Sequence, residues 1–200
     1  MPILIDELSL FFPCHNEEEN LLPLVDEALA SLSALATRYE VIIVDDGSTD
    51  GTAAVAASLV AAHPGVVRLV RHEVNRGYGG ALRSGFAAAT MRRVAFTDGD
   101  RQFRVADLAL LLQVSRERNA PVTVGFRLRR ADPLIRRVYA GVYRFANRFW
   151  FSLNVRDVDC AMKLFDRSVL TNVSVASNGA FFSAELLIKL RAAGVAVAEV

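Results

Sequence analysis

The sequence predicts an α/β fold: a single domain in which a mostly parallel central sheet is flanked by helices. From Leu8 onward, short apolar runs rich in β-branched residues alternate with longer segments of helical period, a pattern typical of βαβ units. The length of 200 residues suits one domain with its own core. Hydrophobic residues make up 52% of the chain and charged residues 22%, which excludes disordered and low-complexity classes.

Strands are expected at the five apolar runs of this alternating part, residues 8–13, 40–45, 66–71, 93–98 and 121–126. Helices are expected in the segments between them, residues 20–36, 51–62, 77–90 and 105–118. Right-handed crossover connections place such strands in one sheet, and the loops that follow the strands then gather along one edge. We therefore expect the functional residues along that edge.

The last third of the chain departs from this alternation. Residues 133–151 predict one long helix rich in Arg and aromatic residues, followed by a strand near 161–165, a helix near 181–193 and a final apolar run over 195–200. Because that run ends at the last residue without a turn or a polar tail, we expect residues 1–200 to be a fragment of a longer protein.

Charge is distributed unevenly along the chain. Lys and Arg number 23 and Asp and Glu 22, so no global basic field points to a nucleic-acid partner. Between Asp6 and Asp50, however, eleven acidic residues accompany one basic residue, whereas Arg127 to Arg156 contains eight Arg and one acidic residue. The nearly neutral total therefore hides an acidic segment and a basic one.

Two cysteines cannot form a disulfide framework, and the N-terminus MPILIDEL has neither the basic region nor the cleavage site of a signal peptide. We therefore expect a reducing, cytoplasmic location. No stretch of eighteen residues is both uncharged and mostly apolar, so these 200 residues are not expected to span a membrane.

The clearest candidate for ligand binding is the pair Asp45 and Asp46, directly after an apolar strand. Carboxylates at a strand end can accept hydrogen bonds from a nucleobase N–H or from ribose hydroxyls. A capped turn between strand and helix explains Gly47 to Thr52. It does not explain two adjacent carboxylates, which repel each other unless a ligand uses them.

A second acidic loop, Pro13 to Asn20, follows the first expected strand. Glu18 and Glu19 suit the first turn of a helix, where the macrodipole favours negative charge. Glu17 lies nearer the sheet edge and is the better ligand candidate. Cys14 and His15 suggest a metal, but no second ligand pair occurs at zinc spacing, so we discount a zinc site.

The third loop contains Asp98 and Asp100, again just after a strand. Two carboxylates separated by one Gly can face one divalent cation, which in turn bridges the phosphate oxygens of a nucleotide. The Gly-rich segment 75–85 does not match a dinucleotide fingerprint, because Leu82 occupies the third glycine position. A helix N-terminus that receives a phosphate still fits that segment.

The ordered motifs PCHNEEEN, VIIVDDGSTDGT, NRGYGGALRSGF and DGDRQ resemble the family 2 glycosyltransferases of GT-A fold, in particular the polyprenyl-phosphate (dolichyl-phosphate) mannose and glucose synthases. This resemblance covers nearly the whole chain. It implies a nucleotide-diphosphate sugar donor, a GDP- or UDP-hexose, and Mg²⁺ or Mn²⁺ as cofactor. The residues implied around the nucleotide are Pro13, His15, Glu17, Asp45, Asp46 and Asp98. The residues implied around the metal are Asp98, Asp100 and Gln102.

Two later segments, Gly125-x-Arg127 and Asp157 to Phe165, are similar to the family motifs that surround the sugar and the acceptor. Ala161 and Met162 replace the Gly-Phe usual in the family, a packing change that bears on the choice of sugar. The basic segment that these enzymes carry after the last strand is absent, because the sequence ends at Val200.

The expected helix over 133–151 fits a lipid-linked acceptor. Apolar residues recur along it at intervals of three and four, while Arg137 and Arg144 line another face. Arg combined with aromatic residues is typical of a helix that lies on anionic headgroups. A helix that covers the sheet, or a subunit interface, gives a similar pattern. The expectation is peripheral binding to the cytoplasmic face of a membrane, with the full-length protein anchored there.

The hypothesis for the reaction is inverting transfer of a hexose to a polyprenyl phosphate, with Asp100, Arg127 and Asp157 as catalytic candidates. A phosphate acceptor is already anionic and needs no base, so the task left for Arg127, Arg137 and Arg144 is to position it. A sugar-hydroxyl acceptor in cell-envelope glycan synthesis would instead need a base, Asp157 or Asp159. A non-catalytic nucleotide-sugar binding module is a further alternative.

Overall fold

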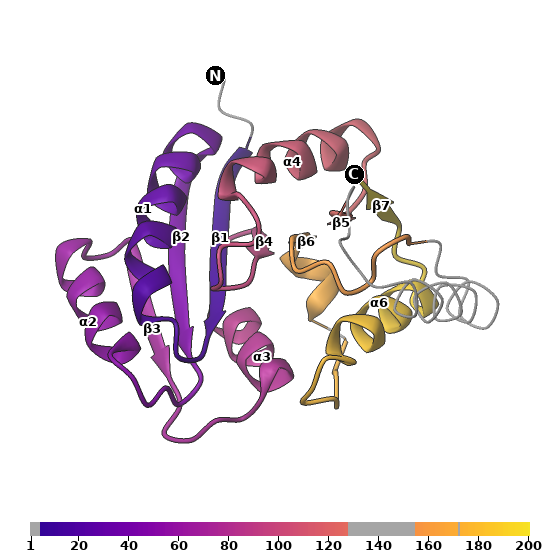
Figure 1. The fold of residues 1–200 in the computed structure, drawn as a ribbon. Helices are drawn as coiled ribbons and strands as arrows, with labels where there is room; N and C mark the ends of the chain where they lie inside the picture. The colour runs from indigo at the N-terminus through magenta and orange to yellow at the C-terminus, as the bar shows by residue number, and fades with distance from the viewer. Residues whose placement is uncertain (1–4, 128–154, 172) are drawn as a thin grey trace.

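A computed structural model describes residues 5–127, 155–171 and 173–200. In these residues the chain forms one seven-stranded sheet with the strand order β3-β2-β1-β4-β6-β5-β7 (Figure 1). The strands are β1 Ile5–Cys14, β2 Ala36–Asp45, β3 Val67–Arg71, β4 Arg93–Phe96, β5 Val122–Val124, β6 Lys163–Asp166 and β7 Val197–Glu199. The helix expected over 133–151 lies outside the described residues.

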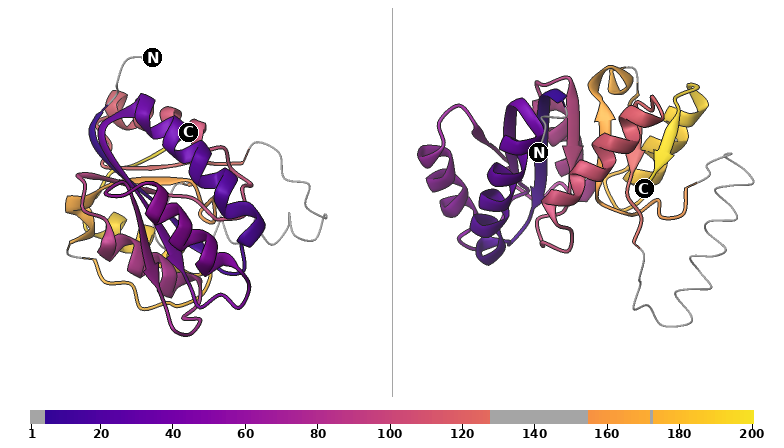
Figure 2. Two further views of the ribbon diagram at one scale, coloured as in Figure 1. Left: turned by 90° about the vertical axis from the view of Figure 1, so that its left-hand side faces the viewer. Right: turned by 90° about the horizontal axis from the view of Figure 1, so that it is seen from above.

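The helices are α1 Glu18–Leu35, α2 Thr52–Ala62, α3 Tyr78–Ala88, α4 Leu108–Glu117 and α6 Phe182–Ala192, with the short 3-10 helices η1 Val105–Asp107 and η2 Arg167–Leu170. They cover both faces of the sheet (Figure 2). Core residues of α1, α2 and α4 pack on one face, whereas those of α3 and α6 pack on the other. The expected α/β architecture, a mostly parallel sheet flanked by helices, is confirmed.

Strand β1 lies in the middle of the parallel half of the sheet, paired with β2 on one side and β4 on the other. Strand β6 enters between β4 and β5 and is antiparallel to both. The sequence analysis expected a strand near this position but not its direction or its place. Those depend on long-range pairing, which brings Lys163 opposite both Phe96 and Val124.

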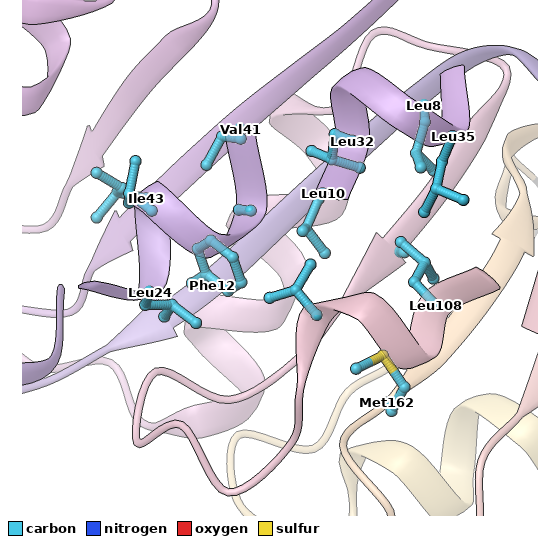
Figure 3. Packing of buried hydrophobic residues seen from close by; sticks show 14 of the residues in the cluster. Leu8, Leu10, Phe12, Leu24, Leu32, Leu35, Val41, Ile43, Leu108 and Met162 are labelled. Atoms are coloured by element: carbon cyan, nitrogen blue, oxygen red, sulfur yellow. The ribbon is translucent and has the colours of Figure 1, made fainter. Parts of the chain in front are cut away.

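The alternation of side chains along β1 builds both halves of the core. Leu10 and Phe12 point toward α1, where they meet Leu32 and Leu24 (Figure 3). Phe11 points to the other face and packs in an aromatic group on the side of α3 and α6. The rings of this group are Phe11, Phe86, Phe96, Phe165 and Phe182. The strand is therefore buried on both faces, as parallel strands under two helix layers usually are.

Candidate functional site

A cavity of about 370 Å³ opens at the carboxyl ends of β1, β2 and β4, beside the N-terminus of α3. Its lining residues are Pro13, Cys14, His15, Glu17, Asp46, Asn75, Gly77, Tyr78, Ala81, Asp98, Gly99 and Asp100. A larger hollow of about 600 Å³ lies near the opposite edge of the sheet. Its half-buried arginine, Arg93, faces Asp166 at 3.9 Å, so part of its charge is already paired within the protein.

The loops after β1 and β2 hold each other in place by hydrogen bonds. The backbone N–H of Asn16 donates to Ser48 Oγ at 3.0 Å, and Thr49 N–H donates to the side chain of Asn16 at 2.9 Å. Glu18 accepts from the N–H of Gly51 at 2.9 Å. This contact gives Glu18 a structural role, in line with its expected place in the first helical turn. These hydrogen bonds hold the two loops together and fix the backbone that carries Glu17 and His15.

Asp45 and Asp46 are adjacent in sequence but have different environments. Asp45 is fully buried and does not line the cavity; its Oδ1 accepts the N–H of Ser48 at 3.0 Å and its Oδ2 lies 3.4 Å from Arg71 Nε. Asp46 lines the cavity. Asp45 thus supports the turn, whereas Asp46 is the member of the pair that can meet a ligand.

The buried side chain of His72 and the half-buried side chain of Ser84 lie behind Asp46. Its Oδ1 accepts from His72 Nδ1 at 2.6 Å and from the backbone N–H of Arg76 at 2.9 Å. The other ring nitrogen of His72 lies 2.8 Å from Ser84 Oγ on α3. The sequence alone does not point to His72 or Ser84, because a single histidine beyond β3 belongs to no motif described above.

Asp98 lies two residues beyond the end of β4 and is held by a tyrosine at the start of α3. Tyr78 donates its hydroxyl to Asp98 Oδ1 at 2.9 Å. Burial raises the pKa of Asp98, the hydrogen bond from Tyr78 opposes this rise, and the neighbouring charge of Asp100 adds to it. Burial, followed by the charge of Asp98, likewise raises the pKa of Tyr78, which keeps its hydroxyl protonated as a donor.

The turn before Tyr78 depends on glycine. Gly77 has φ +79°, and a Cβ there would lie 2.7 Å from the carbonyl oxygen of Asn178. The same carbonyl accepts the N–H of Gly79 at 2.8 Å. The chain around Asn178 is itself fastened to α3, because Arg83 donates to the carbonyl of Ser177 at 2.8 Å. The wall of the cavity at α3 is therefore built on contacts from the last quarter of the chain.

The carboxylates of Asp98 and Asp100 both line the cavity, and their oxygens are the ligand type that Mg²⁺ and Mn²⁺ prefer. Gln102 does not line it; its amide donates to Asp100 Oδ2 at 2.7 Å. Within the described residues no group of three His, Cys, Asp or Glu side chains is arranged to hold a metal. Two carboxylates fit a cation whose remaining ligands come from a bound diphosphate, as in other nucleotide sites.

A fully buried lysine lies near the acidic wall. Lys163 donates to the carbonyl of Cys160, lies 3.3 Å from Ser183 Oγ, and has its ammonium 5.3 Å from the centre of the Phe96 ring. Burial lowers its pKa to about 8, and nearby acidic groups, among them Asp98, oppose this lowering. In the sequence this lysine lies within the motif Asp157 to Phe165, but nothing there predicts a role of its own.

Arg127 and Asp157, both expected near the acceptor, are paired with each other. Arg127 Nε lies 2.8 Å from Asp157 Oδ2, and a second nitrogen of the guanidinium lies 3.2 Å from Oδ1. The hydrogen bond with Asp157 raises the pKa of Arg127. Next to this pair, Arg156 stacks over the Phe126 ring at 4.5 Å and its Nε lies 3.3 Å from Glu199.

The other two acceptor candidates, Arg137 and Arg144, lie outside the described residues. In the part of the chain that the structure describes, no helix combines the length and the apolar character needed to cross a bilayer.

The mostly parallel sheet and the acidic cavity at its carboxyl edge define a GT-A glycosyltransferase domain. The sequence profile described as Glycosyl transferase family 2 matches residues 9–173. The chain belongs to this family, as its motifs led us to expect.

Two curated relatives place the chain near the polyprenyl-phosphate sugar synthases. Dodecaprenyl-phosphate galacturonate synthase of Rhizobium johnstonii is 30% identical over 175 residues, which is 87% of this chain and 52% of the relative. Dolichyl-phosphate beta-glucosyltransferase of Drosophila melanogaster is 32% identical over 180 residues, 81% of this chain and 55% of the relative. The resemblance to this branch is confirmed, and the chain spans about half the length of these relatives.

Solved structures support the fold. Glucosyl-3-phosphoglycerate synthase from Mycobacterium tuberculosis, in complex with phosphoglyceric acid, matches with a TM-score of 0.77 at 23% identity, over 97% of this chain and 69% of that one. The same enzyme in complex with Mn²⁺, UDP and glucosyl-3-phosphoglycerate matches with a TM-score of 0.73 at 24% identity, with the same coverage. At this identity the likeness establishes the architecture alone.

Proposed function

We propose that the protein transfers a hexose from a nucleotide-diphosphate sugar to a polyprenyl phosphate at the cytoplasmic face of a membrane. The observation that carries this proposal is the cavity in which Asp46, Asp98 and Asp100 meet. A buried acceptor for a nucleobase and a pair of carboxylates for a cation on the diphosphate are the two ends of a nucleotide-sugar site.

Within this cavity Pro13, His15, Glu17 and Asp46 would receive the nucleoside, and Asp98 and Asp100 would hold Mg²⁺ or Mn²⁺. The hydrogen bond from Tyr78 leaves the second oxygen of Asp98 available. When bound, such a cation supplies positive charge that offsets the charge on the departing diphosphate.

In the transfer itself, an oxygen of the acceptor phosphate forms a bond to the anomeric carbon of the sugar. The bond between that carbon and the diphosphate breaks, and its electron pair leaves with the nucleoside diphosphate. Attack opposite the leaving group inverts the anomeric centre. The acceptor oxygen is already anionic, so no general base is required, and Arg127 with Arg137 and Arg144 positions the phosphate.

The names of the curated relatives favour a polyprenyl phosphate over a sugar hydroxyl as acceptor. The pairing of Asp157 with Arg127 is a second argument, because the guanidinium already engages the carboxylate that a hydroxyl acceptor would need as its base. Binding to the membrane surface through the segment 133–151 is part of the same proposal and brings the site to a lipid-linked acceptor.

The test is a transfer assay with radiolabelled UDP-glucose or GDP-mannose, undecaprenyl phosphate in detergent, and Mn²⁺. We expect label in the lipid fraction, and a loss of at least a hundredfold in Asp100→Asn. The matched control is Glu19→Gln, which makes the same kind of change at an exposed site away from the cavity. Label transferred only to a sugar or to phosphoglycerate would replace the proposed acceptor.

A further inference from the structure

The carboxylate of Asp46 has one satisfied oxygen and one open oxygen. Its side chain is 5% exposed. Oδ1 accepts two hydrogen bonds, from His72 and from the N–H of Arg76. Oδ2 accepts none from any described residue, although Asp46 lines the cavity. Oδ2 can therefore accept a hydrogen bond from a ligand that enters the cavity.

The contacts of His72 fix the direction of that open oxygen. A carboxylate only accepts hydrogen bonds, so His72 Nδ1 carries the proton in the 2.6 Å bond to Asp46. In the neutral ring Nε2 is then an acceptor, and the hydroxyl of Ser84 donates to it across 2.8 Å. His72 is 3% exposed. Its ring therefore cannot turn without breaking a hydrogen bond at each nitrogen.

We infer that His72, held by Ser84, is a positioning residue that aims Asp46 Oδ2 at the ring N–H of a uracil or guanine base. This inference rests on the proposed function for the presence of a UDP or GDP donor and goes beyond it by assigning the orientation of Asp46 to His72 and Ser84. Uracil N3 and guanine N1 carry a hydrogen and can donate to the carboxylate. Cytosine N3 carries a lone pair, and a lone pair facing a carboxylate is repelled.

The hydrogen bond between Ser84 and His72 links the orientation of Asp46 to helix α3. The Ser84 hydroxyl connects the ring of His72 to the same helix whose N-terminal residues, Gly77 and Tyr78, line the cavity. The part of the cavity at Asp46 and the part near Asp98 are therefore both linked to α3. Without His72, Oδ1 of Asp46 would keep only the N–H of Arg76, and the carboxylate would be free to rotate between its two oxygens.

The experiment is isothermal titration of the 200-residue chain with UDP, GDP and CDP in Mn²⁺. We expect UDP or GDP to bind at least tenfold more tightly than CDP, and methylation of the ring nitrogen (N3-methyl-UDP or N1-methyl-GDP) to remove that advantage. In His72→Phe, which preserves ring volume without a donor, the preference over CDP falls to about threefold or less. His72→Asn, which keeps a donor near Nδ1, restores part of it.

Ser84→Ala should lower the same preference by a smaller factor, because it loosens His72 without removing it. His63→Phe is the matched control, since His63 lies at the end of α2 away from the cavity and keeps the preference unchanged. A purely structural role for His72 predicts that His72→Phe weakens UDP, GDP and CDP by one common factor. That result, or an unchanged preference, would overturn the inference alone. Absence of binding of all three nucleotides by the unaltered chain would overturn the donor site as well.

Discussion

At the scale of single residues, the hydroxyl of Tyr78 controls how Asp98 is presented. Asp98 is mostly buried, which disfavours its charged form, and the 2.9 Å hydrogen bond from Tyr78 offsets part of that cost. Tyr78 thus hydrogen-bonds one carboxylate oxygen of Asp98, at the place where a cation and a diphosphate are proposed to bind. Its contribution should be visible only when the metal is present.

We therefore predict that Tyr78→Phe weakens UDP or GDP binding in Mn²⁺ by about three- to tenfold, the effect of losing one hydrogen bond to a charged group. Affinity measured in EDTA should change by less than twofold. Titration calorimetry on both variants checks this, with Tyr39→Phe as control, because no described residue hydrogen-bonds to the Tyr39 hydroxyl and it lies outside the cavity. Equal weakening with and without metal would contradict the account.

The adjacent residues Asp45 and Asp46 show which properties of a site a sequence motif can predict and which it cannot. Repulsion between adjacent carboxylates draws attention to Asp45 and Asp46 together, but it does not separate their roles. Which of them faces the cavity follows from the strand end: Asp45 is the last residue of β2 and points inward, and Asp46 is the first beyond it. His72 could not be predicted at all, because its partner Ser84 is brought near only by the packing of α3.

At the scale of elements, the N-terminus of α3 depends on a close approach to the chain at Asn178. Gly77 and Gly65 share φ +79°, but only Gly77 would place a Cβ against another backbone atom, the carbonyl oxygen of Asn178. Comparing the same substitution at Gly65 and at Gly77 therefore separates the free-energy cost of the backbone conformation from that of the contact with Asn178.

We predict that Gly65→Ala lowers the free energy of unfolding by about 1 kcal/mol, the cost of a left-handed conformation for a residue with a Cβ. Gly77→Ala should lower it by about 2 kcal/mol or more and should also weaken nucleotide binding, because Gly77 lines the cavity. Urea unfolding measures both. Equal losses in the two variants would mean that Asn178 does not support α3.

The buried Lys163 on strand β6 is expected to make stability depend on pH. Burial lowers the pKa of Lys163 to about 8 from 10.5. Below pH 8 both folded and unfolded chains hold the proton, and the cost of burying the charge is fully present. Between pH 8 and 10.5 the unfolded chain binds more protons, so this lysine makes the free energy of unfolding rise with pH, by on the order of 3 kcal/mol in total.

Urea unfolding at pH 7.5 and pH 10 tests this by comparison with Lys163→Met. We expect the unaltered chain to gain stability relative to the variant as the pH rises, by about 2 kcal/mol over this interval. The comparison cancels the titration of cysteines and tyrosines that both chains share. Identical pH dependence in the two chains would show that Lys163 is not charged and buried in the way described.

Among the elements, those with strong local patterns were predicted best. The four helices between the first strands were expected within a few residues of their observed bounds, and all five early strands form. The expected strand over 93–98 ends at Phe96, because the chain turns into the loop that carries Asp98. The insertion of β6 between β4 and β5 was not foreseen, since antiparallel pairing with both neighbours has no local signature.

At the scale of the whole molecule, nucleotide binding and acceptor binding are proposed for two different parts of the chain. The acidic segment supplies part of the cavity lining, including Glu17 and Asp46, and the eight arginines between Arg127 and Arg156 supply the proposed contact with phosphate and with a membrane surface. Net charge is only +1, so binding to a surface would depend on this local concentration rather than on a global field.

We predict that the chain co-sediments with vesicles containing anionic lipid at low salt and that 0.5 M NaCl reduces binding, because salt screens exposed charges. Arg137→Glu with Arg144→Glu should reduce binding by at least tenfold. The charge-matched control replaces the exposed Arg116 and Arg191, which lie on α4 and α6, and should reduce binding far less. Equal losses in both double variants would contradict a membrane role for the segment 133–151.

The most direct test of the central claim is the thermal unfolding midpoint with UDP, GDP and CDP, each with and without Mn²⁺. A ligand that binds only the folded chain raises the midpoint by mass action. The account predicts a metal-dependent rise with UDP or GDP that is absent in Asp100→Ala, whereas Glu19→Ala keeps it. No rise with any nucleotide, or a rise that survives loss of Asp100, would contradict a nucleotide-sugar site at this edge of the sheet.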